Sequence, residues 1–113
     1  MPVRYFVTLP DPARVRDAGQ FAFTSQGAGG LAEELQAALR GDALFQRWRR
    51  TLDDPDDVDP ALGATDPSAT VEGLQHDLHI DLVVTTTLPG EVFRHRMRLL
   101  AGNAWELRDV TAA

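Results

Sequence analysis

The chain has 113 residues, a formal net charge of −6 and no cysteine. Its length is typical of a single domain with a modest core. Without thiols it can form no disulfide, zinc–thiolate site or iron–sulfur cluster. All eleven basic side chains are arginine, which excludes a lysine Schiff base and a P-loop lysine. The arginine-only usage indicates a GC-rich bacterial genome.

Hydropathy along the chain argues against a membrane protein. The first ten residues contain no apolar stretch long enough for a signal peptide. No window approaches the roughly 18 apolar residues that a membrane-spanning helix needs. We therefore expect a cytoplasmic protein that does not enter a membrane.

The first half of the chain predicts one clear strand and two helices. Residues 3–9 alternate between apolar and other side chains and end at Pro10, as in a half-buried strand. Residues 21–24 suggest a short second strand. Leucine recurs every four residues over 31–39, which predicts an amphipathic helix, and 42–52 predicts a second helix with its apolar residues on one stripe.

The acidity of the chain is concentrated in one segment. Residues 53–75 carry seven acidic and no basic side chains, and three prolines fall within residues 53–68. A segment with so few apolar residues cannot bury enough surface to offset the conformational entropy lost on ordering. We therefore expect a mobile loop over residues 53–68. A calcium loop is disfavoured, because the glycine and terminal glutamate of an EF-hand are missing.

The C-terminal part shows the strongest alternation of apolar and polar residues. Residues 78–84 and 93–99 both alternate, and a Pro-Gly turn at 88–91 lies between them. Pairing across this turn puts Leu82 opposite Met97 and every large apolar side chain on one face. With a third strand at 105–107, the pattern predicts a three-stranded antiparallel meander.

Together these elements predict an α+β fold, a two-layer sandwich in which two helices cover the apolar face of an antiparallel sheet. The outer face would carry a row of arginines from the middle strand, accompanied by acidic and apolar residues. The side chains predicted to bind a partner on this face are Arg94, Arg96, Arg98, Asp81, Val83 and Leu100.

The mixed chemistry of that face favours a protein partner over nucleic acid. Single-stranded RNA needs aromatic side chains for stacking beside the basic residues, and we expect none on this face. Acidic neighbours such as Asp81 also neutralise part of the positive charge. The leading hypothesis is therefore a non-catalytic module for protein binding or homodimer assembly, and no family signature is recognised.

The histidines offer weaker alternatives. In a continuous strand His76 and His79 point to opposite faces, so we predict no metal site, although His79 with Asp77 and Asp81 is a minor possibility. His95 falls on the apolar face. A small enzyme or ligand-binding domain with a pocket between helices and sheet, using His95 as acid or base, is thus the alternative function. Neither reading requires a cofactor.

Overall fold

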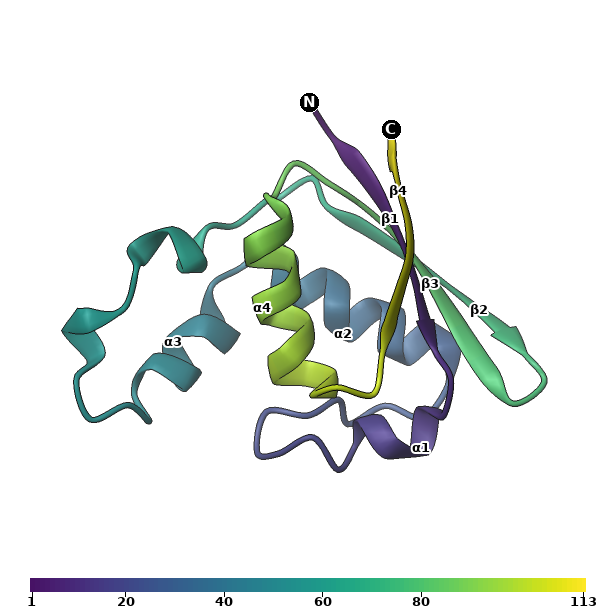
Figure 1. Cartoon of the computed structure of the whole chain (residues 1–113), viewed down its shortest axis with the longest axis horizontal. Coiled ribbons are helices and arrows are strands. Elements are labelled where there is room, and N and C mark those ends of the chain that lie inside the picture. The colour runs from purple at the N-terminus through teal and green to yellow at the C-terminus, as the bar shows by residue number, and fades with distance from the viewer.

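The computed structural model describes residues 1–113 and contains a four-stranded antiparallel sheet with helices on one face (Figure 1). This arrangement confirms the predicted α+β sandwich. In chain order the elements are β1 (Val3–Leu9), α1 (Pro12–Val15), α2 (Ala28–Arg40), α3 (Ala43–Arg49), the 3-10 turns η1 (Pro55–Asp57) and η2 (Pro60–Gly63), β2 (Thr70–His76), β3 (His79–Thr86), α4 (Gly90–Ala101) and β4 (Glu106–Ala112).

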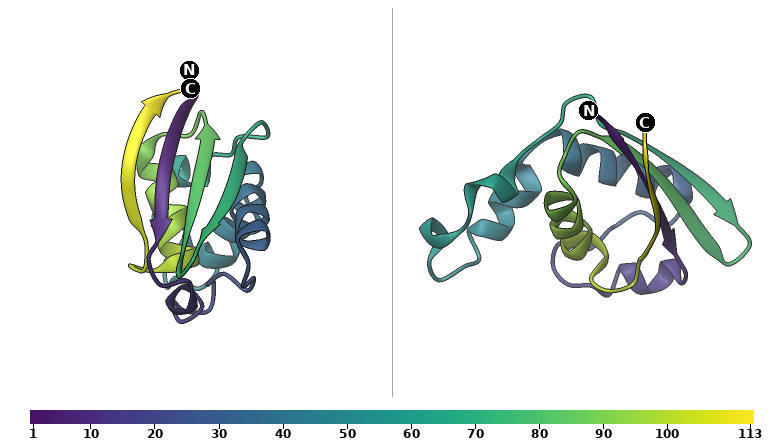
Figure 2. Two further views of the ribbon diagram at one scale, coloured as in Figure 1. Left: turned by 90° about the vertical axis from the view of Figure 1, so that its right-hand side faces the viewer. Right: turned by 45° about the horizontal axis from the view of Figure 1, so that its top comes forward.

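The strands lie in the order β2-β3-β1-β4, with β1 and β3 in the centre (Figure 2, left). Each strand is antiparallel to its neighbours. A strand–helix–strand–strand–helix–strand succession in this order is the split βαβ, or ferredoxin-like, arrangement. The segment with α3, η1 and η2 is an insertion between α2 and β2, and it extends away from the sheet (Figure 1).

The predicted meander is wrong, because residues 90–101 form the helix α4 rather than its middle strand. Their buried positions are spaced one, four, five, eight and nine residues after the first, which is a helical stripe. Those positions are Val92, Phe93, Arg96, Met97, Leu100 and Ala101. The segment also contains one β-branched residue among many strong helix formers. The stripe is hard to recognise in the sequence because one of its buried positions is an arginine, Arg96.

The remaining strands pair differently from the prediction. β3 lies between β2 and β1, so Leu82 faces Val7 and Gly73 instead of Met97. β2 was not predicted. β4 overlaps the predicted strand at 105–107 but begins at Glu106, and it pairs with β1. Residues 21–24 form no strand, although Phe23 is buried and its N–H donates to the carbonyl of Leu100.

The core lies between the sheet and the helices. The alternation of β1 turns Tyr5, Val7 and Leu9 toward the helices, where they join a cluster of 22 buried residues. Tyr5 stacks on Phe93 of α4 with ring centroids 4.3 Å apart, and its hydroxyl donates to the carbonyl of Leu88. These contacts pack α4 and the residues before it against β1.

Gly73 allows α2 to lie directly on β2. A Cβ atom at this position would lie 2.2 Å from the backbone oxygen of Ala28, at the first turn of α2. No side chain fits within that distance of a backbone atom, so the glycine sets how closely helix and sheet approach. Val71, two residues earlier on the same strand, is buried against the helices.

The acidic segment is more structured than its composition suggested. It contains η1 and η2, and near its end the buried Asp66 accepts hydrogen bonds from the N–H groups of Thr87 and Ser68 and from the hydroxyl of Thr86. These bonds, with that from Thr87 foremost, hold the pKa of Asp66 below its ordinary value. The mobility expected for residues 53–68 stays a prediction, but Asp66 is anchored to the end of β3.

Leu82 and Met97 are both fully buried, so Leu82→Ala and Met97→Ala should each lower the free energy of unfolding by about 2 to 5 kcal/mol. Val83→Thr, on the opposite face of β3, should cost less than about 1 kcal/mol. Urea unfolding of the three variants checks this expectation. A loss at Val83 as large as at Leu82 would mean that the outer face of the sheet is covered in solution.

Candidate functional site

The face of the sheet opposite the helices is open (Figure 2, left). A groove of about 610 Å³ runs across it over β2, β3, β1 and β4. Its walls combine apolar and charged side chains, among them Phe6, Thr8, Leu74, Asp81, Val83 and Arg108. Leu74 is 49% exposed although it is a large apolar residue. Phe6 and Val83 are half-buried and face each other across β1 and β3.

The charges on the open face are mixed, with an excess of acid. Strand register places two arginines and four carboxylates on this side: Arg4, Arg108, Glu72, Asp81, Glu106 and Asp109. Arg108 is the extra residue of a β-bulge in β4, a device that redirects a side chain, and its guanidinium donates to Glu106 at 3.0 Å. The open face therefore differs from the arginine-rich face predicted from the sequence.

At one end of the groove, two histidines stand side by side, which corrects the prediction that they point to opposite faces. β2 ends at His76 and β3 begins at His79, so the two residues are a cross-strand pair joined by a two-residue turn. Asp77 in this turn has φ of 47°, a left-handed conformation that aspartate adopts more readily than most residues. The imidazole rings stack with centroids 5.2 Å apart.

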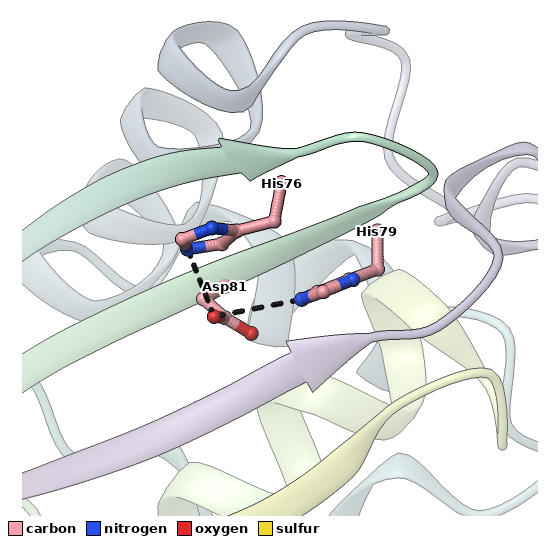
Figure 3. Close-up of side chains that lie close together, drawn as sticks. All are labelled: His76, His79 and Asp81. Atoms are coloured by element: carbon pink, nitrogen blue, oxygen red, sulfur yellow. Dashed lines mark ion pairs between the residues drawn. The ribbon is translucent and has the colours of Figure 1, made fainter.

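Asp81 completes this cluster of His76, His79 and Asp81 (Figure 3). One carboxylate oxygen, Oδ2, lies 3.2 Å from Nε2 of His76 and 3.7 Å from Nε2 of His79. The other oxygen, Oδ1, accepts a hydrogen bond of 2.6 Å from the hydroxyl of Thr8 on β1. Thr8 therefore fixes the carboxylate with Oδ2 toward both imidazoles.

The six predicted binding residues do not form one surface. Asp81 and Val83 lie on the open face, as predicted. Arg94, Arg96, Arg98 and Leu100 lie on α4, on the other side of the sheet, and Leu100 is buried in the core.

Arg96 is fully buried and has a structural position. Its guanidinium donates to the carbonyls of Ala38 at the end of α2, and of Leu62 and Ala64 in the insertion. Burial lowers the pKa of Arg96 from its ordinary value, whereas the carboxylate of Asp42 raises it. Arg94 and Arg98 are exposed to solvent.

His95 does not lie in the groove. It is half-buried on α4, and its ring lies 4.5 Å from the ring of Trp48 on α3 in an edge-on arrangement. Its Nδ1 is buried without a hydrogen-bond partner. Burial lowers the pKa of His95, and the charges of Arg98 and Arg96 lower it further. His95 does not line the hollow between α2 and α3 either, and the acid–base alternative stays a hypothesis.

Sequence reasoning missed Phe6, Thr8, Leu74, His76 and Arg108 as residues of one surface. The available signal was the residue pair Asp77-Leu78, because an aspartate at a hairpin turn ends a strand and reverses the chain. With that turn placed correctly, His76 and His79 become neighbours.

Comparison of the chain with protein-family models, with curated proteins and with solved structures gives no match. Among the helices, none has the length and apolar character required to cross a membrane.

Arg96→Ala should reduce the free energy of unfolding by at least about 3 kcal/mol, because it removes a fully buried side chain and leaves one buried and two part-buried carbonyls without their donor. Arg94→Ala and Arg98→Ala remove exposed side chains and should change it by no more than about 0.5 kcal/mol. Chemical denaturation measures all three. Equal, small effects would contradict the anchoring role of Arg96.

The lowered pKa of His95 predicts that the free energy of unfolding depends on pH. The pKa of His95 in the folded protein lies below the ordinary value of 6.5, so below that pH the unfolded chain binds more protons and stability falls with acidification. The decline should end once the pH passes below the lowered pKa. His95→Gln should flatten the decline in unfolding free energy between about pH 7.5 and pH 5.5. An unchanged slope in the variant would refute this assignment.

Proposed function

We propose that this domain is a non-catalytic binding module whose open sheet face binds a partner polypeptide. The observation that carries the proposal is an uncovered four-stranded face with a groove of about 610 Å³. Phe6 and Val83 form an apolar centre in the groove, and the half-exposed Leu74 extends it toward the edge strand. Apolar groups surrounded by charged ones are typical of protein-recognition surfaces.

Charge complementarity indicates the chemistry of the partner. Four carboxylates and two arginines on the open face leave an excess of two negative charges. The carboxylates of Glu72 and Asp109 flank Val83 and Phe6 in the same row of the sheet. A partner with apolar residues at its centre and arginine or lysine at its rim matches this distribution.

The same charges argue against nucleic acid. A phosphate backbone requires uncompensated positive charge, whereas the three arginines expected to supply it belong to α4. Phe6 is the single phenylalanine, tyrosine or tryptophan in the groove, whereas single-strand binding normally stacks successive bases on several such rings.

Charge argues against a second copy of the chain as the partner. Each open face carries an excess of two negative charges, so two such faces brought together would repel each other.

A random peptide library displayed on phage tests the proposal. We expect the selected peptides to combine apolar residues with arginine or lysine, and to shift the NMR signals of β1, β2 and β3 residues on the open face. Val83→Arg should abolish binding because it fills the groove and adds a positive charge. Val110→Arg, at a more exposed valine outside the groove, is the control for the added charge and should bind normally.

Two results would overturn the proposal. One is the selection of no peptide, or only of peptides that shift signals on α3 or α4. The other is equal binding by the Val83→Arg and Val110→Arg variants with both proteins folded, as judged by their melting temperatures. Sedimentation of the free protein should give a monomer. A stable dimer would indicate instead that the open face binds a second copy of the chain.

A further inference from the structure

The cluster of His76, His79 and Asp81 has the geometry of a ligand set as well as of an ion-pair network. Each residue offers one donor atom, and the three donor atoms lie within 4.8 Å of one another. Two donors bonded at about 2.1 Å to one tetrahedral ion are about 3.4 Å apart. The distances of 3.2 and 3.7 Å from Asp81 Oδ2 to the two Nε2 atoms bracket that value. Both imidazoles are half-exposed, which leaves them room to turn toward a shared ion.

The surroundings hold the donors in place. The hydroxyl of Thr8 occupies Oδ1 of Asp81 and leaves Oδ2 free for the cluster, the kind of outer hydrogen bond that orients a metal-binding carboxylate. The side-chain amide of Gln75 donates to the carbonyls of Asp77 and His79 and so spans the turn between the histidines. Both contacts use atoms other than the three donor atoms, so they are compatible with a bound ion and support the donors around it.

The donor types select the class of ion. Two imidazole nitrogens and one carboxylate oxygen suit zinc and its neighbours among the first-row divalent metals. Calcium and magnesium require a shell made almost entirely of oxygen, which this cluster does not supply.

We propose that His76, His79 and Asp81 bind one divalent transition-metal ion, with zinc as the reference ion. This goes beyond recognition of a polypeptide and does not depend on it. Three protein donors leave at least one coordination position open. His79 and Asp81 also line the groove, so a ligand in the groove can reach the open position.

The competing interpretation is that the cluster is only a surface hydrogen-bond network. In that case the two imidazoles are only polar neighbours of the same carboxylate, and zinc binds no better than it does to scattered surface groups. Zinc titration can distinguish the two interpretations, because the chain has few other imidazole or thiol side chains that bind zinc. Cysteine is absent, and the third of the three histidines, His95, lies on α4.

Calorimetric titration of the full chain, free of any histidine tag, with zinc chloride is the direct test. We expect one ion per chain, and a loss of affinity of at least about a hundredfold in each of His76→Ala, His79→Ala and Asp81→Asn, because each removes a ligand. Thr8→Val should weaken binding by about tenfold, since it removes only the outer hydrogen bond. Cobalt in place of zinc should give the absorption bands of a tetrahedral site.

Matched controls identify the donors. His95→Gln removes the remaining histidine, and Asp77→Asn changes a carboxylate in the same turn. Both should bind zinc like the parent. Zinc should also raise the melting temperature of the parent but not that of His79→Ala.

The outcomes that would overturn the proposal are equally direct. Zinc binding that survives His76→Ala and Asp81→Asn, or that disappears in His95→Gln, would place the ion elsewhere. Absence of stoichiometric binding in the folded parent would leave the cluster as a hydrogen-bond network. Because each variant changes a half-exposed side chain, equal melting temperatures without metal will show that folding is intact.

Discussion

The guanidinium group of Arg96 joins three parts of the chain at one buried point. Its hydrogen bonds to the carbonyls of Ala38, Leu62 and Ala64 connect α4 to the end of α2 and to the insertion. No carboxylate hydrogen-bonds to this cation, so three backbone dipoles supply its solvation. The helical layer depends on this interaction, because it fixes α4 beside α2. Because the helices all lie on this side of the sheet, the opposite face is uncovered, and that is where the groove and the histidine cluster lie.

The sequence was sufficient to predict the α+β class, β1, α2 and α3, because their apolar residues recur with the period of one strand or one helix. It was misleading for α4. Phe93, His95, Met97 and Leu99 alternate as in a strand, and the helical stripe becomes visible only when Arg96 is counted as a core residue. A buried arginine is rare enough that hydrophobic patterning treats it as surface. Because Arg96 was treated as a surface residue, the helix α4 was predicted as a strand. β3 was then paired with that strand instead of with β1 and β2.

Prediction of the site failed for a related reason. A strand continuing through residues 76–84 separates the two histidines, whereas a turn at Asp77 and Leu78 makes them cross-strand neighbours. Thr8 and Phe6 could not be assigned to the same surface without knowing that β1 pairs with β3. Asp81 and Val83 were assigned correctly, since both lie in a strand whose alternation was clear. Local pattern thus identified single residues, and long-range register decided which of them meet.

His76, His79 and Asp81 fall within six consecutive residues of one hairpin, while Thr8 is 73 positions away from Asp81. Hairpins close within about 1 to 10 μs, whereas contacts between distant segments form later because they require closure of long loops. The two imidazoles and the carboxylate would therefore meet early in folding. The carboxylate gains its fixed orientation only when β1 arrives beside β3. A fragment containing the hairpin without β1 would hold the same three donors, but the carboxylate would be free to rotate.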